Sequence, residues 1–70
     1  MDPRDYVHEL GARLEASTDG AERSALIGML AATGSADAGP YLAEALACEE
    51  DPDLCERIRT ALAVLEPFDR

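Results

Sequence analysis

The stretch GSADAGPYLAEALACEEDPDLCERIRTALA, residues 34–63, contains the residues that decide the fold. It holds two apolar runs separated by an acidic linker. The second run follows Asp51 and Pro52, where an acid at the N-cap and a proline at the first helical position mark a helix start. Its apolar residues then recur about every 3.6 residues, at Leu54, Ile58, Ala61, Leu62 and Leu65. This spacing predicts a helix that Glu66 and Pro67 end.

The first run of the stretch predicts a shorter helix. The segment extends from Ser35 to about Cys48, and Pro40 lies inside it. Because proline lacks a backbone N–H, we expect an irregular first turn and a regular helix only from near Gly39 and Pro40. The apolar stripe of this segment is Tyr41, Leu42, Ala45 and Leu46.

Residues before this stretch carry similar signals. Asp2 and Pro3 predict the start of a first helix, and its apolar face is Val7, Leu10 and Leu14. Asp19 and Glu22 have the spacing of a capping box, which predicts the start of a second helix. The expected inner face of this second helix is Leu26, Met29, Leu30 and Thr33.

Two glycines refine the second helix. Gly28 lies inside it, where glycine costs up to about 1 kcal/mol of helix propensity, and we interpret it as a point of close helix–helix approach. Gly34 stands where the residue after a helix end is expected. No segment alternates polar and apolar residues over a useful length, so strands are not predicted. The predicted fold is all-α, with four helices in one domain over residues 1–70.

The chain also repeats internally. Asp19 and Asp51 are 32 residues apart, and the same offset relates four pairs of apolar residues. The pairs are Leu10 with Leu42, Leu14 with Leu46, Leu26 with Ile58, and Leu30 with Leu62. This agreement indicates a helical repeat. Because helix pairs of about this length stack into solenoids, we expect a four-helix α-α superhelix of about two repeats.

The stretch from Gly34 to Ala63 resembles the short HEAT-like repeats typified by phycobilisome lyases. Their pattern is roughly G-D-x-x-A-x-P-x-L-x-x-A-L, an acidic linker, and D-P-x-V-R-x-x-A-x-x-A-L. The residues that match it here are Gly34, Ala38, Pro40, Leu42, Ala45, Leu46, Asp51, Pro52, Leu54, Ala61 and Leu62. The resemblance implies a scaffold or binding surface. It does not imply lyase activity, because nothing in this sequence marks a bilin site.

The preceding helix is similar to a weaker copy of the second half of this pattern. It keeps Asp19, Arg23 and Leu30 but has Gly20 where proline is usual. The family places a basic residue after the apolar position of the second half. Arg23 holds that position in the first copy, whereas Cys55 holds it in the second. The resemblance implies that such arginines link neighbouring repeats. In the second copy, the candidates to replace the missing arginine are Arg57 and Arg59.

Composition and charge exclude several classes of function. The chain has 70 residues, with 15 acidic against 6 basic and a net charge of −9, which argues against binding nucleic acid phosphates or anionic membranes. No apolar run is long enough to span a membrane. The first residues lack the basic and apolar regions of a secretory signal, so we expect a cytoplasmic protein.

The candidate partner-binding residues are Glu49, Glu50, Asp53, Glu56 and Phe68. The four acids belong to a dense cluster that forms a patch for a basic partner or a divalent-cation site, although it lacks calcium-loop spacing, or that gathers where a helix dipole favours negative charge. Phe68 follows Pro67 in a polar tail. It either folds back onto the last helix or docks on a partner.

The sequence predicts no catalytic, cofactor or metal site. The two cysteines, Cys48 and Cys55, have no further Cys or His nearby that would complete a four-ligand zinc site. They are either two small buried side chains, or a redox pair or half of a metal site. His8 is the single histidine and lacks a neighbouring nucleophile and acid arranged for proton transfer.

These observations favour a non-enzymatic interaction module, a small acidic adaptor or regulatory subunit. The alternative is an acidic inhibitor-type protein, such as an antitoxin, immunity protein or nucleic-acid mimic, that binds a basic surface. Four helices leave the outer faces of the first and last without neighbours, and repeat arrays usually need three or more units. We therefore expect a partner protein or a second copy to cover one outer face.

Overall fold

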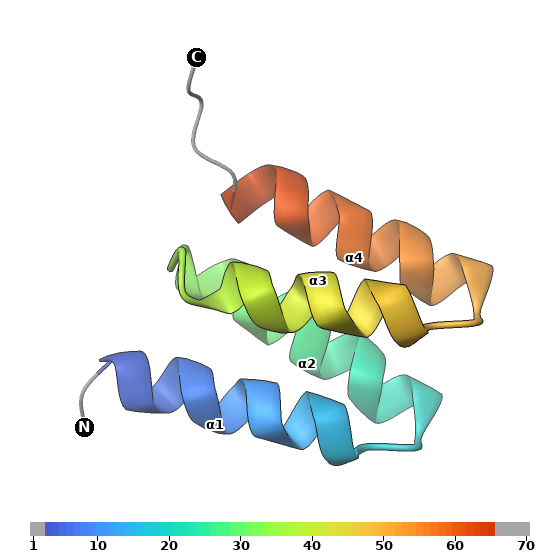
Figure 1. The fold of residues 1–70 in the computed structure, drawn as a ribbon, viewed down its shortest axis with the longest axis horizontal. Helices are drawn as coiled ribbons and strands as arrows, with labels where there is room; N and C mark the ends of the chain where they lie inside the picture. Colours follow the sequence, from blue (N-terminus) through green and yellow to red (C-terminus); the bar gives the residue numbers. More distant parts are fainter. Residues whose placement is uncertain (1–2, 66–70) are drawn as a thin grey trace.

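The computed structural model describes residues 3–65 and folds them into four α-helices (Figure 1). They are α1 Pro3–Ala16, α2 Gly20–Thr33, α3 Ala38–Cys48 and α4 Pro52–Leu65. Over these residues there is no strand, which confirms the all-α prediction. The predicted helix starts are also confirmed, since α2 and α4 begin directly after Asp19 and Asp51.

The chain forms two antiparallel helix hairpins, α1–α2 and α3–α4 (Figure 1). Between the hairpins, α1 packs beside α3 and α2 packs beside α4, while α2 also contacts α3. The Cα atoms extend over 31 × 29 × 16 Å. The molecule is therefore a slab two helices thick, with α1 and α3 in one layer and α2 and α4 in the other.

The start of α2 is capped much as the sequence predicts. The Glu22 backbone N–H donates to Asp19 Oδ2 at 3.3 Å, as expected for an N-cap aspartate. The Glu22 carboxylate, however, accepts from the Ser17 hydroxyl at 2.9 Å, and the Ser17 Oγ accepts from the Asp19 N–H at 3.3 Å. Ser17 thus bridges the two partners of the predicted capping box.

The turn between α2 and α3 explains the late start of α3. Gly34 has φ +66°, a left-handed conformation that favours glycine, and its N–H donates to the Ala31 carbonyl. A turn at residues 36–37 follows, as predicted, and Pro40 occupies the third position of α3. The N–H groups of the first helical turn have no carbonyl partner within the helix. The missing N–H of Pro40 therefore costs no hydrogen bond of the helix.

The core lies between the two layers and contains only apolar side chains. Its buried members are Val7, Leu10, Leu14, Leu26, Ile27, Leu30, Ala38, Leu42, Leu54, Ile58 and Ala61. Partly buried residues packed against it are Ala31, Tyr41, Ala45, Leu46, Leu62 and Leu65. Every apolar position predicted for α1, α3 and α4 is in one of these two sets.

The predicted inner face of α2 is wrong in one respect. Met29 is 41% exposed, whereas Ile27, which the prediction omits, is fully buried. The cause is that α2 contacts all three other helices, so its buried arc is broad and is centred on Leu26, Ile27 and Leu30. The stripe expected from the sequence shares Leu26 and Leu30 with that arc but extends to Met29 on one side, whereas the arc extends to Ile27 on the other.

The interpretation of Gly28 is also wrong, because the glycine at a close helix approach is Gly11. Gly11 is buried in α1, and a Cβ built on it would overlap the ring of Tyr41 in α3. A Cβ built on Gly28 would meet nothing within 4 Å. Beside Gly11, the Tyr41 hydroxyl and His8 Nδ1 form a hydrogen bond between α1 and α3, and the two rings meet edge to face.

None of the four described helices combines the length and the apolar character that crossing a membrane requires.

Candidate binding surface

The acidic cluster of the sequence occupies the loop between α3 and α4 and the first turns of α4. Asp51 caps α4, since its Oδ1 accepts from the Asp53 N–H at 2.9 Å and its carbonyl accepts from the Cys55 N–H at 2.9 Å. Asp53 lies in the first helical turn, where the helix dipole favours negative charge. Part of the cluster therefore stabilises the start of α4.

Glu49 holds this loop in place. Its Oε2 accepts backbone N–H groups of Glu50 and Asp51, at 3.2 and 3.0 Å. Its Oε1 lies 2.6 Å from Nη2 of Arg23, and the two side chains are only 7% and 22% exposed. This ion pair links α2 of the first hairpin to the loop of the second. Among the candidate partner-binding residues, Glu49 is thus turned inward.

The other candidates differ in their positions. Glu50, Asp53 and Glu56 are exposed, and none of the three side chains makes an ion pair with another described residue. Asp53 and Glu56 lie on α4, whereas Glu50 lies in the loop. Phe68 lies outside the described residues. The exposed acids therefore remain available to a partner.

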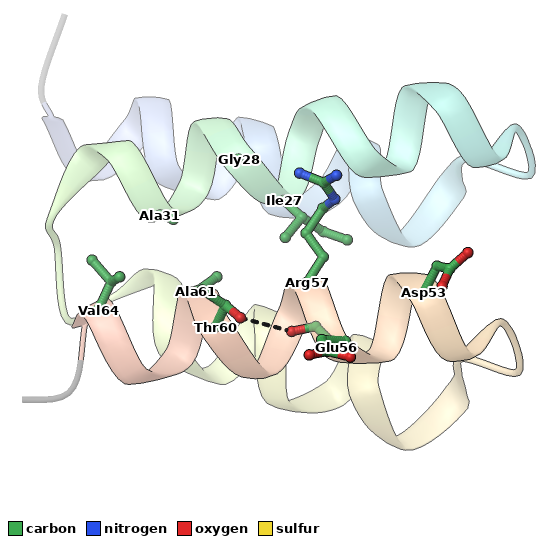
Figure 2. A pocket seen from close by; sticks show the side chains of 9 residues that line it. All are labelled: Ile27, Gly28, Ala31, Asp53, Glu56, Arg57, Thr60, Ala61 and Val64. Atoms are coloured by element: carbon green, nitrogen blue, oxygen red, sulfur yellow. Dashed lines mark hydrogen bonds between the residues drawn. The ribbon is translucent and has the colours of Figure 1, made fainter.

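A groove runs along the outer layer between α2 and α4, with a volume of about 580 Å³. It is lined by Ile27, Gly28, Ala31, Asp53, Glu56, Arg57, Thr60, Ala61 and Val64 (Figure 2). Gly28 leaves open space on one side, and Val64 is 63% exposed on the other. This groove is not predicted from the sequence, although the 32-residue offset relates Gly28 to Thr60 across it.

Arg57 lies in the middle of the groove. Figure 2 shows its guanidinium reaching from α4 toward α2, beside Ile27. Asp53 is four residues earlier on the same helix, a spacing that allows an ion pair, but Arg57 makes none with any residue in the range 3–65. The groove thus offers acids near the start of α4, a cation at its centre and apolar side chains near the end of α4.

A second, smaller hollow of about 340 Å³ lies among α1, α2 and α3. Its lining is Leu14, Glu15, Arg23, Glu44, Ala45 and Cys48. Arg23 is engaged by Glu49, so the exposed charges left in this hollow are the carboxylates of Glu15 and Glu44. It has less apolar surface than the α2–α4 groove and is a weaker binding candidate.

The two cysteines are free thiols. Cys48 is exposed at the end of α3, and Cys55 is half-buried, with its Sγ donating to the Glu49 carbonyl at 3.5 Å. Among residues 3–65, no three His, Cys, Asp or Glu side chains gather in a group that would hold a metal ion.

Comparison of the chain with known protein families, with curated proteins and with solved structures finds no match. What defines the protein is therefore its own geometry: an all-helical slab with an acidic loop and an open groove.

Proposed function

We propose that the chain is a cytoplasmic, non-enzymatic protein–protein interaction module, a small acidic adaptor or regulatory subunit, built from two stacked HEAT-like helix pairs. The observation that carries the proposal is the correspondence of helix ends at an offset of 32. Adding 32 to the bounds of α2, Gly20–Thr33, gives the bounds of α4, Pro52–Leu65. The last residues of α1 and α3, Ala16 and Cys48, are related in the same way. Each helix also packs beside its counterpart.

The Arg23–Glu49 ion pair supports this interpretation. In HEAT-like repeats an arginine at the position of Arg23 is expected to link one repeat to the next, and Arg23 reaches the loop of the second hairpin. Cys55 occupies the corresponding position of that hairpin and contacts the same residue, Glu49, through a thiol. Neither Arg57 nor Arg59 makes an ion pair in the described chain.

The free face of the first hairpin supports a binding role. Ala38 and Ala61 are buried in the core shared by the two hairpins. Their counterparts at the 32-residue offset are Tyr6 and Met29, which are 40% and 41% exposed. Because α1 and α2 are antiparallel and joined by a short loop, Tyr6 and Met29 lie at the same end of the hairpin. A partner protein or a second copy covers this face in the proposal.

Recovery of the affinity-tagged chain from its host tests the role. We expect a stoichiometric partner, or a dimer, that the substitutions Tyr6→Gln and Met29→Gln remove. Ala12→Gln, at an exposed position of α1, is the matched control that keeps the partner. A chain recovered alone and monomeric from both wild type and variants contradicts the proposal.

A second candidate is an inhibitor-type protein that binds a basic surface, such as an antitoxin, immunity protein or nucleic-acid mimic. The net charge of −9 and the exposed Glu50, Asp53 and Glu56 favour it. Ionic strength distinguishes the two candidates. A complex held by an apolar face survives high salt, whereas one held by charge dissociates.

A further inference from the structure

We propose that the groove between α2 and α4 is a docking site for a basic amphipathic helix of a partner protein. The inference rests on the proposed interaction role and assigns to it a surface and a partner chemistry. The groove has a volume of about 580 Å³, and Arg57 crosses it from α4 toward α2 near the centre, so a docking helix packs against this side chain (Figure 2).

The floor of the groove suits a helix. Gly28, Ala31 and Ala61 are small, and a Cβ at Gly28 would meet nothing within 4 Å, so a third helix is able to approach α2 and α4 closely. Val64, which is 63% exposed, supplies apolar surface near it, while the fully buried Ile27 lies beneath the floor. Amphipathic helices bind grooves of this kind through apolar residues spaced three and four apart.

The charges of the groove select a basic partner. Asp53 lies near one end and Glu56 beside Arg57, and Val64 lies about 16 Å from Asp53 along α4, since a helix rises about 1.5 Å per residue. A matching helix has lysines or arginines at the end that lies beside Asp53, and apolar side chains about three turns away, beside Val64. Arg57, at the centre, is placed to meet an acid or a carbonyl group of that helix. The net charge of −9 opposes a second copy as the occupant.

A synthetic peptide tests the assignment. The probe is a fluorescent helix of about 18 residues, long enough to span the groove at about 1.5 Å per residue, with leucines along one face and lysines beside them. A peptide of the same composition in scrambled order, without an apolar face, is the control. We expect the full-length protein to bind the amphipathic peptide at least about ten-fold more tightly than the scrambled one, with amide shifts concentrated in α2 and α4.

Variants distinguish binding in the groove from attraction to the acidic surface in general. Gly28→Leu fills the floor without changing charge and should weaken binding at least about ten-fold. Gly20→Leu, another exposed glycine of α2 with open space around it, should not. The double variant Asp53→Lys/Glu56→Lys should weaken binding more than Glu15→Lys/Glu44→Lys, which alters net charge equally outside the groove. Circular dichroism verifies that each variant is folded.

Several results would overturn the proposal. Equal binding of both peptides, or no effect of Gly28→Leu, would assign the binding to charge alone. Amide shifts confined to the Tyr6–Met29 face would place the binding site elsewhere, and the proposed interaction role would survive. A large gain in peptide affinity on Phe68→Ala would show that the C-terminal tail occupies the groove. Salt-dependent dimers that Gly28→Leu abolishes would show that a second copy of the chain occupies it.

Discussion

Gly11 and Gly28 show how much one methyl group matters at the scale of a residue. Both lie inside helices, but only Gly11 faces an aromatic ring, that of Tyr41. We expect Gly28→Ala to raise the free energy of unfolding by up to about 1 kcal/mol, because alanine is the better helix former. Gly11→Ala should lower it by about 1–3 kcal/mol, because the ring must move. Denaturant unfolding followed by circular dichroism measures both. Changes of the same sign would contradict the assignment of the close approach.

The acidic residues also differ from one another at this scale. Glu49 is 7% exposed, pairs with Arg23 and accepts two backbone N–H groups. Glu9 pairs with Arg13 on the surface of α1. We expect Glu49→Ala to cost about 1–3 kcal/mol, since it leaves a largely buried guanidinium and two donors unpaired. Glu9→Ala should stay within about 0.5 kcal/mol. Equal unfolding midpoints for the two variants would show that Glu49 is no more structural than a surface acid.

At the scale of elements, the sequence predicts the helix starts and the faces of α1, α3 and α4, whereas the face of α2 is predicted only in part. Starts depend on local chemistry: Asp19 and Asp51 each cap the helix that follows through a side-chain oxygen. The face of α2 depends on its three neighbours, which a single helix pattern does not contain. Alanines and glycines weaken its apolar stripe further, so Met29 is predicted inside and Ile27 is overlooked.

The candidate site could be predicted only in part for the same reason. The acids of the loop are visible in the sequence, but the inward turn of Glu49 depends on Arg23, which is distant along the chain. The groove depends on α2 lying beside α4 and on Arg57 reaching across rather than back to Asp53. These are tertiary facts that residue spacing does not determine.

The 32-residue correspondence gives a prediction for the helices of the outer layer. Leu30 of α2 is fully buried, whereas its counterpart Leu62 of α4 is only partly buried, because α4 has fewer neighbours. We therefore expect Leu30→Ala to cost about 2–5 kcal/mol and Leu62→Ala clearly less. Thermal and denaturant unfolding of the two variants measures the difference. A larger loss for Leu62→Ala would mean that another surface covers α4 in solution.

At the scale of the whole molecule, charge and packing are separated. The buried set contains no polar or charged residue within the described range, so apart from the Arg23–Glu49 pair the charged side chains of that range lie at the surface. The sequence has fifteen acids against six arginines, and the acids within residues 3–65 repel one another across short distances in a slab 16 Å thick. Such self-repulsion keeps a protein soluble and opposes its compact state.

This repulsion predicts that salt stabilises the fold. Screening lengths fall to about 10 Å at 0.1 M salt, so repulsion between surface acids weakens as sodium chloride is added, whereas the burial of the core is unaffected. We expect the melting temperature to rise with salt concentration. This rise should be smaller when Glu44, Glu50 and Glu56 are replaced together by glutamine, since all three are exposed and unpaired in the described chain. Sodium sulfate is compared with the chloride to separate screening from salting-out, which depends on the anion. A melting temperature that is flat or falls with sodium chloride would show that attractive ion pairs outweigh the repulsion, and Arg23–Glu49 would be the first pair to remove.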